Sequence, residues 1–521
     1  MDFMNEVKNT MNSYLQRTEN GALGYQTSGK ELLDMNFMVS SFRNKSDGEI
    51  ENAFSKAYFE NPMLAIKWLF YARDARGGLG ERRLFRVAFN WLISFDKEVA
   101  IKLASLIPEF GRWDDLIFLL NSDAEEISNL VLSEIKNQLV KDMENCANNK
   151  PISLLAKWMP SINTSSYATK ALARKVIAGL KVTEKTYRKT LSALRAYLKV
   201  VETKMCAKEW EEIDYSAVPS RANLIYNSAF LRNDEQRRRS YLAALEKGET
   251  KINGSVNFPH DIVSAYSYGS CWHCSTKPYD STLEALWKAL PDYVNGAGNT
   301  ICVADGSGSM TSKVGNTKVS CLDVANALAI YFAEHSSGAF KDKYITFSSR
   351  PQFVDFSAAK SLKQKLEIAL KHNECANTNI EAVFDLILNT AVRTHCPQSE
   401  LPANVLVLSD MEFDSCAESN SVSANYWGCR SYSRPNKTLF DTIAAKFATY
   451  GYKMPRLVFW NICSRTGTIP VRQNELGVAL VSGFSPAIAS MVLSGKTDPF
   501  ECLVEQLSKP RYQVIEDRLR N

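Results

Sequence analysis

The 521-residue sequence predicts an α plus α/β fold, with a helical domain over residues 1–294 and a doubly wound α/β domain over residues 295–521. Three observations lead to this prediction. The chain is too long for one hydrophobic core, because single cores stop growing beyond about 250–300 residues. Apolar residues recur at helical spacing up to about residue 290. After about residue 295, short apolar runs alternate with helical segments, which is typical of a parallel sheet covered by helices.

The N-terminal half reads as almost wholly helical. Apolar residues three and four apart recur, for example across residues 54–71, 84–92 and 101–107, and short Gly or Pro punctuation separates the segments. Helices paired through short turns indicate an α-solenoid of HEAT-like repeats, although no repeat is regular enough to fix a period.

A glycine-rich turn lies between basic residues in the phrase Arg73-Asp74-Ala75-Arg76-Gly77-Gly78-Leu79-Gly80-Glu81-Arg82-Arg83, just before a helix. The N-terminus of a helix can bind phosphate. A nucleotide-binding P-loop would continue with Gly-Lys-Ser or Gly-Lys-Thr, and this phrase does not. We therefore interpret it as a tight corner between two helices, held by Arg/Glu pairs.

Basic charge is concentrated in residues 151–208, which contain twelve Lys and Arg against two Asp and Glu, a local balance of +10 in a chain of net charge +5. A helix is expected after Thr183, which can cap it. At about 100° per residue, one face of this helix is apolar and the opposite face is basic. The basic face comprises Lys185, Arg188, Arg195 and Lys199. It is either a solvated helix surface or a contact for RNA phosphates, and its isolation in an otherwise acidic half strengthens the second interpretation.

The α/β half is expected to begin with a strand at Ile301–Ala304 and a helix at Leu322–Ala333. Further strands are expected at residues 343–347, 352–356 (an antiparallel edge), 405–408, 456–461 and 478–481. Helices are expected at residues 362–370, after Thr378, at 439–449 and at 500–507. In doubly wound sheets, ligands bind beyond the carboxyl ends of the strands.

Oxygen-bearing side chains follow two of these strands. The first strand ends in Asp305, and Ser307 and Ser309 follow in a glycine-containing loop that can turn tightly enough to bring them together. The strand at residues 405–408 ends in Ser409-Asp410, and Thr378 precedes a helix in the loop between. Hard oxygen ligands of this kind suit Mg²⁺ or Mn²⁺ better than zinc.

In this chain order, Asp305, Ser307, Ser309, Thr378 and Asp410 resemble the metal-ion-dependent adhesion site of von Willebrand factor A domains. The resemblance covers roughly residues 295–500. It implies that the two serines bind the ion directly and that Thr378 and the aspartates contribute directly or through water. It also implies an open coordination position, which an Asp or Glu of a protein partner can fill.

The helical half followed by this domain resembles the layout of TROVE/Ro ribonucleoproteins and, more closely, an uncharacterised family of that organisation in plants, bacteria and large viruses. The closer resemblance is carried by residues 73–82, Ala156-Lys157-Trp158-Met159-Pro160-Ser161, residues 253–262 and Ser409-Asp410-Met411-Glu412-Phe413-Asp414. Ro proteins bind small non-coding RNAs with a ring of helical repeats. RNA binding is therefore expected at the level of the class.

Composition points to a globular cytoplasmic protein with no membrane contact. No apolar run reaches the ~20 residues that span a bilayer, and the N-terminus shows no basic-then-apolar signal. Twelve cysteines, mostly isolated in apolar contexts such as Cys302, read as reduced core residues.

Two functions fit these features. The first is an RNA-binding, ribonucleoprotein-type scaffold with a divalent-metal-dependent interaction site, and the alternative is a metal-dependent protein–protein adaptor that does not bind RNA. We expect no enzyme activity, because the chain has no nucleophile elbow or P-loop and none of its five histidines is near Ser307 or Ser309 in sequence.

Overall fold

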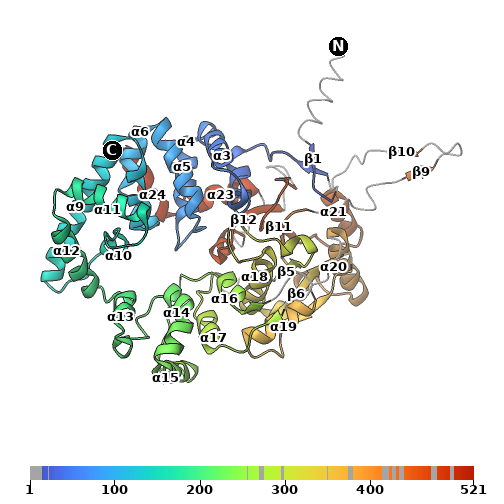
Figure 1. The fold of residues 1–521 in the computed structure, drawn as a ribbon. Helices are drawn as coiled ribbons and strands as arrows, with labels where there is room; N and C mark the ends of the chain where they lie inside the picture. Colours follow the sequence, from blue (N-terminus) through green and yellow to red (C-terminus); the bar gives the residue numbers. More distant parts are fainter. Residues whose placement is uncertain are drawn as a thin grey trace, which may run out of the picture. The chain divides into compact units, whose positions relative to one another are not determined.

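The structure, a computed structural model, describes residues 15–20, 23–254, 256–268, 275–294, 299–348, 350–372, 379–412, 422–424, 430–432, 439–470, 478–492 and 498–520 (Figure 1). It combines helices with a central mixed sheet, so the coarse prediction of an α plus α/β fold is confirmed.

The chain forms two compact units. The first contains residues 1–46, 55–61 and 257–506, and the second contains residues 47–54, 62–256 and 507–521. These two units differ from the expected division after residue 294. Residues 1–46 and 55–61 join residues 257–506 in the first unit, and residues 507–521 join the second. The first is called the sheet unit below, and the second the helical unit.

The sheet unit contains six strands in the order β12-β11-β8-β5-β6-β7. All neighbours are parallel except β6 and β7, so the expected antiparallel edge is present. The strands are β5 (Thr300–Asp305), β6 (Lys343–Phe347), β7 (Phe353–Asp355), β8 (Asn404–Ser409), β11 (Arg456–Asn461) and β12 (Val478–Ser482). Strands β5, β8, β11 and β12 are buried along nearly their whole length, which explains their largely apolar sequences.

Helices connect and cover these strands (Figure 1). Helix α18 (Cys321–His335) packs against β5, β6 and β8, and its first turn is closed by a capping box between Ser320 and Asp323. The others are α16 (Pro259–Tyr266), α17 (Ser281–Lys288), α19 (Leu362–Lys371), α20 (Ile380–Thr394), α21 (Leu439–Thr449), α22 (Ala489–Val492) and α23 (Pro499–Leu507). Short strand pairs are formed by β3 (Ser267–Tyr268) with β4 (Ser275–Thr276) and by β9 (Val422–Ala424) with β10 (Arg430–Tyr432).

An N-terminal segment also belongs to the sheet unit, which the sequence did not predict. Strands β1 (Leu15–Arg17) and β2 (Leu23–Tyr25) form a hairpin, and Tyr25 pairs with Ile469 after β11. Helix α2 (Glu31–Phe37) packs against β12. Beyond it, the Ser40 hydroxyl donates to the backbone carbonyl of Asn461 at 2.9 Å. These contacts cover the carboxyl ends of β11 and β12.

The helical unit is built from helices that pack on their sequence neighbours, such as α4 (Pro62–Arg73) on α5 (Arg82–Phe95) and α14 (Ser220–Asn233) on α15 (Glu235–Glu246). The others are α6 (Lys97–Ala104), α7 (Ile107–Phe110), α8 (Trp113–Phe118), α9 (Glu125–Ala147), α10 (Leu155–Trp158), α11 (Tyr167–Leu180), α12 (Glu184–Tyr197), α13 (Val201–Ala207) and α24 (Pro510–Arg520). Helix α3 (Asp47–Glu60) is divided between the two units.

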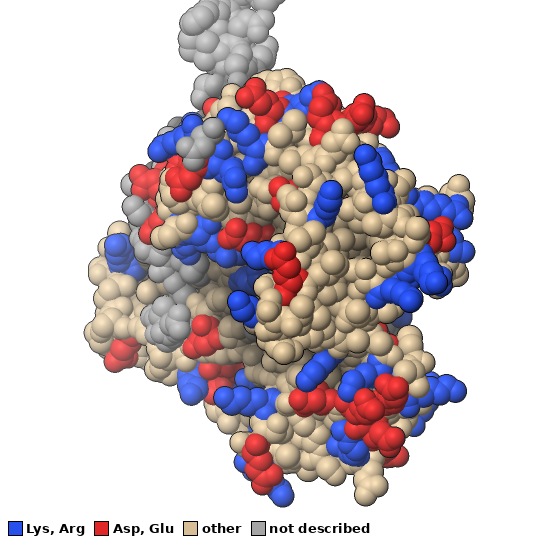
Figure 2. Space-filling view, turned by 90° about the vertical axis from the view of Figure 1, so that its left-hand side faces the viewer, with Lys and Arg blue, Asp and Glu red and all other residues tan. Residues whose placement is uncertain are grey.

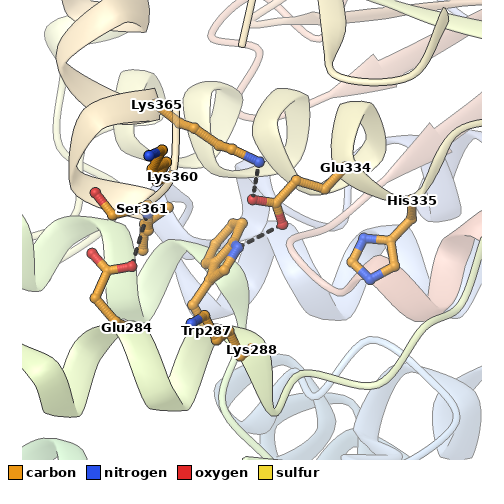
Figure 3. Close-up of a pocket in the computed structure, with 9 residues that line it drawn as sticks. Glu284, Trp287, Lys288, Glu334, His335, Lys360, Ser361 and Lys365 are labelled. Atoms are coloured by element: carbon orange, nitrogen blue, oxygen red, sulfur yellow. Dashed lines mark hydrogen bonds and ion pairs between the residues drawn. The ribbon is translucent and has the colours of Figure 1, made fainter. Parts of the chain in front are cut away.

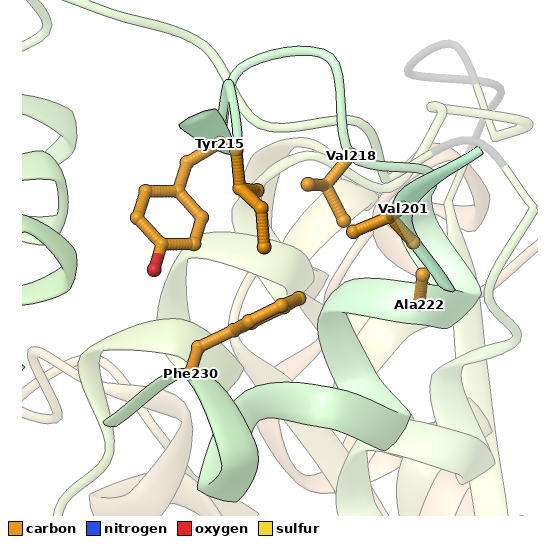
Figure 4. Close-up of a cluster of buried hydrophobic side chains, with 6 residues drawn as sticks. Val201, Tyr215, Val218, Ala222 and Phe230 are labelled. Atoms are coloured by element: carbon orange, nitrogen blue, oxygen red, sulfur yellow. The ribbon is translucent and has the colours of Figure 1, made fainter. Parts of the chain in front are cut away.

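Part of the helical unit has a small hydrophobic core of its own around Phe230 (Figure 4). Its buried members are Val201, Ile213, Tyr215, Val218, Ala222 and Phe230. The fully buried guanidinium of Arg238 lies 4.9 Å from the ring centre of Tyr215 and 5.2 Å from that of Phe230. Arg238 therefore packs in this core through cation–π contacts. Arg237 and Arg239, on either side of it in sequence, form exposed ion pairs.

Candidate functional site

The first part of the site is the loop after β5. Asp305 is the last residue of this buried strand, and its carboxylate is itself buried. Its Oδ1 accepts the backbone N–H of Ser307 at 2.9 Å, which turns the loop back over the end of the strand. The hydroxyls of Ser307 and Ser309 lie 2.9 Å apart. The loop therefore gathers one carboxylate and two hydroxyls.

The second part comes from the end of β8, the neighbour of β5 in the sheet. The Ser409 hydroxyl donates to Oδ2 of Asp305 at 2.6 Å. The next residue, Asp410, is buried. Its charge is close enough to raise the pKa of Asp305, and the Ser309 hydroxyl is close enough to lower that of Asp410. Asp305, Ser307, Ser309 and Asp410 thus converge, and we call this set the oxygen cluster.

The sheet topology explains why the cluster forms at this place. From β5 the chain moves outward to β6 and β7, and then returns to β8 on the other side of β5. The order therefore reverses between β5 and β8, where the connecting segments leave in opposite directions. Ligands of doubly wound sheets bind in the crevice at such a point.

Burial gives the cluster an unusual electrostatic state. Burial of Asp305, with the nearby charge of Asp410, raises the pKa of Asp305 from 3.8 to about 7, although hydrogen bonds from Ser409 and Ser307 oppose the rise. Burial also raises the pKa of Asp410, opposed by Ser309 and by Arg465. Two adjacent buried carboxylates repel each other when both are ionised. A cation between them would remove that cost.

These residues fit a hard divalent ion. Oδ2 of Asp410 is buried and accepts no hydrogen bond from any described residue, so an acceptor is left for another ligand. Oδ2 of Asp410 lies 3.4 Å from Nη2 of Arg465, with which it forms an ion pair. Carboxylate and hydroxyl oxygens are ligands that Mg²⁺ and Mn²⁺ prefer. Within the described ranges, no group of three or more His, Cys, Asp or Glu side chains could hold a metal ion, and the oxygen cluster itself has only two carboxylates beside its two hydroxyls.

Two neighbouring residues were not anticipated as part of this site. Arg465, in the loop after β11, pairs with Asp410 and also with Glu19 of the N-terminal segment, at 2.8 Å. Glu412 is buried and accepts the backbone N–H groups of Glu19, Arg465 and Thr466 at 2.9–3.0 Å. The sequence does show that Arg465 follows a buried strand, which could have suggested a place near the site. Its partners, however, depend on the tertiary fold.

The remaining predicted site residues have different outcomes. Thr378 lies outside the described residues. Lys185 and Arg188 are exposed on α12, and Lys199 is exposed just beyond it in a left-handed backbone conformation. Arg195 instead points inward, and its guanidinium donates to the carbonyls of Ala156 and Met159, both at 2.8 Å, and to the Ser161 hydroxyl at 2.9 Å. The four basic residues predicted to bind RNA therefore do not form one exposed stripe, because the Arg195 side chain is hydrogen-bonded to the segment before α11.

A cavity of about 310 Å³ lies elsewhere in the sheet unit, beside the C-terminal end of α18 (Figure 3). The carboxylate of Glu334 accepts the indole N–H of Trp287 and the ammonium of Lys365, both at 2.7 Å. The carboxylate of Glu284 accepts the first N–H groups of α19 at 2.8 and 3.1 Å. Both carboxylates are matched by donors of the protein itself, so we read these contacts as structural.

The fold and the oxygen cluster define a protein with a helical unit and an α/β unit that carries a candidate cation site at its switch point. The family model described as "Domain of unknown function (DUF2828)" matches residues 18–130 and 130–299, more than half of the sequence. This chain belongs to that family. A second model, "Domain of unknown function (DUF7788)", matches residues 299–514, and neither is a TROVE or von Willebrand factor A model.

The chain also resembles a viral protein, "Uncharacterized protein L728" of Acanthamoeba polyphaga mimivirus. The two are 29% identical over 531 residues, which cover 95% of this chain and 87% of the viral protein. The similarity spans both halves of the sequence. Within the described part of the chain, no helix is both long and apolar enough to cross a membrane.

Proposed function

We propose that this protein is an RNA-binding scaffold whose sheet unit holds a divalent cation, Mg²⁺ or Mn²⁺, and uses it to contact an acidic side chain of a protein partner. The convergence of Asp305, Ser307, Ser309 and Asp410 at the switch point carries the metal-dependent part. A bound cation would supply positive charge where two buried carboxylates otherwise oppose each other.

The protein's own residues would bind and orient the ion. Asp305 and Asp410 would provide negative charge, while Ser307 and Ser309 would provide neutral oxygens. These four side chains supply fewer oxygens than the octahedral shell of Mg²⁺ requires, so a coordination position would stay open for a partner's Asp or Glu. This arrangement and its resemblance to von Willebrand factor A domains support an interaction site rather than a catalytic centre.

Calorimetric titration of the full chain with Mg²⁺ and with Mn²⁺ tests the metal-dependent part. The wild type should bind one ion, and Asp305→Asn should weaken binding by roughly tenfold or more, because the ion loses a charged ligand. Asp355→Asn, an exposed carboxylate of the same unit, is the matched control. Equal binding by the wild type and Asp305→Asn would contradict the proposal.

Exposed basic residues support the RNA-binding part. Lys185 and Arg188 face solvent on α12, and neither forms an ion pair with a described residue. Positive and negative side chains are interspersed on the face shown in Figure 2, so on this face contacts to RNA would come from local groups of basic residues. The resemblance of the layout to TROVE/Ro proteins, with HEAT-like helical repeats, supports the same class of ligand.

Fluorescence anisotropy with labelled single-stranded RNA tests this part. Affinity should fall steeply with salt, and the double charge reversal Lys185→Glu/Arg188→Glu should weaken it. Arg239→Glu, on an exposed site of α15, is the control. If the wild type binds no RNA while EDTA and Asp305→Asn still release a protein partner, the protein is a metal-dependent adaptor without RNA binding, which is the second candidate.

A further inference from the structure

The glycine-rich corner between α4 and α5 has a feature that the proposed function does not use. Four arginines from three elements meet two neighbouring aspartates of α8 at this place. We call the set the arginine corner, and it comprises Arg73, Arg82, Arg86 and Arg112 with Asp114 and Asp115. The expected Arg/Glu pairs of a structural corner are thus Arg/Asp pairs.

The inner part of the corner is tightly paired. Asp115 is fully buried, and its Oδ2 accepts Nε and Nη2 of Arg73 at 2.8 and 2.6 Å. Its Oδ1 accepts Nε of Arg86 at 2.8 Å. Burial alone would raise the pKa of Asp115, but Arg73 and Arg86 hold it below its ordinary value. This part stabilises the fold.

The outer part shares one carboxylate among three cations. Asp114 pairs with Arg82, with Arg86 at 3.3 Å and with Arg112 at 3.0 Å. Four arginines against two aspartates leave an excess of two positive charges. Burial lowers the pKa of both Arg86 and Arg112, and repulsion from Arg82 adds to that effect. Like charges held together in a partly buried place are costly unless an anion joins them.

The outer guanidinium groups also keep donors for such an anion. Nη1 of Arg82, Arg86 and Arg112 donates no hydrogen bond to any described residue. Exposure increases outward, from 4% of the Arg73 side chain to 33% of Arg112 and 45% of Arg82.

Aromatic rings hold two of these groups in place without using their N–H donors. The Arg112 guanidinium lies 4.2 Å from the ring centre of Trp158, and that of Arg86 lies 4.5 Å from Phe118. Such stacking fixes the plane of a guanidinium. The donors are therefore oriented before a ligand arrives.

We propose that the arginine corner binds a phosphate group, and specifically a backbone phosphate of single-stranded RNA. Guanidinium groups pair with phosphate oxygens through two parallel hydrogen bonds, and one phosphate supplies the negative charge that the corner lacks. The proposal rests on the RNA-binding part of the proposed function, for which it adds a contact away from α12. Arg82 and Arg112 contact the phosphate, whereas Arg73 positions Asp115.

Anisotropy with labelled single-stranded RNA tests the proposal in the full chain. Arg82→Gln and Arg112→Gln should each weaken binding by roughly tenfold and reduce the slope of log affinity against log salt by about one. Arg82→Lys keeps the positive charge but loses the planar guanidinium. Its RNA affinity should therefore lie between that of the wild type and that of Arg82→Gln. The control Arg239→Gln removes an exposed arginine of α15 and should have little effect. Circular dichroism identifies any variant that fails to fold.

Inorganic phosphate provides the second measurement. Phosphate should raise the Tm of the wild type more than chloride does at equal ionic strength, and the double variant Arg82→Gln/Arg112→Gln should lose this difference. If phosphate acts in this way but no RNA binds, the corner is a site for a small phosphate ligand and the RNA-binding part of the function is wrong. If RNA binds with unchanged affinity and salt slope in the double variant, the proposed RNA contact is overturned while RNA binding stands.

Discussion

The oxygen cluster and the arginine corner are charged sites of opposite sign. In the oxygen cluster two buried carboxylates lie together, and Oδ2 of Asp410 accepts no hydrogen bond from the described residues. In the arginine corner four guanidinium groups share two carboxylates. One site has excess acceptors and the other has excess donors.

Other buried carboxylates in the same protein are fully matched by hydrogen-bond donors, and they provide a comparison for these two sites. Asp74 is fully buried, and its carboxylate is matched by the Arg76 backbone N–H, by Arg511 and by the Tyr512 hydroxyl. Glu412 is likewise surrounded by donors. A buried charge that protein groups fully match needs no ligand, whereas a buried polar atom without a partner is able to accept one.

The largest expected effect is on the stability of the arginine corner. Asp115→Asn removes the buried partner of Arg73 and Arg86, so the free energy of unfolding should fall by about 3–5 kcal/mol. Urea denaturation followed by circular dichroism measures the change. Asp114→Asn, at the more exposed neighbouring position, is the control and should lower the free energy of unfolding by less. A loss below about 1 kcal/mol for Asp115→Asn would show that its charge is not needed.

The oxygen cluster should respond to pH in a way that depends on metal. The pKa of Asp305 is raised in the folded protein, so folding favours its protonated form. In EDTA this group should therefore contribute most stability below about pH 4 and lose that contribution as pH rises to about 7. Mg²⁺ should oppose the loss, because it binds the ionised form and displaces the proton.

Thermal unfolding from pH 4 to pH 8, with EDTA or with Mg²⁺, measures this effect. The stabilisation by Mg²⁺ should increase with pH and level off above about pH 7. Asp305→Asn removes one of the two carboxylates whose pKa is raised and should reduce the pH dependence of the Mg²⁺ effect. The interpretation fails if Mg²⁺ stabilises the wild type equally at all of these pH values.

The smallest expected effect concerns Arg465, whose positive charge lies beside Asp410. Arg465→Gln removes repulsion toward a divalent ion, so Mg²⁺ affinity should rise by roughly fivefold, or about 1 kcal/mol. Calorimetric titration measures the change. Lys365→Gln removes a positive charge of α19 that pairs with Glu334 near the C-terminal end of α18, and it should leave the affinity unchanged. Weaker Mg²⁺ binding by Arg465→Gln would instead mean that Arg465 orients Asp410 for the ion.

Much of the sheet unit could be predicted because local patterns determine it. Apolar strands that end in Asp305 and Asp410 specify both the sheet and the edge at which these groups lie. The basic face of α12 was less predictable. Helical periodicity places Arg195 on that face, but its long side chain reaches back to the carbonyls of Ala156 and Met159. Periodicity gives the direction of Cβ, whereas a flexible side chain follows the nearest unmatched acceptors.

By itself, the sequence determined the class of the two parts, the strands that end in oxygen-bearing residues and the four residues that make up the oxygen cluster. Short-range spacing is enough for these, because strand and helix periods are local properties. Only the tertiary structure decided that residues 15–46 belong to the sheet unit, that Arg465 and Glu412 flank the cluster, and that four arginines meet two aspartates. These depend on pairings between segments far apart in the chain, which no local pattern encodes.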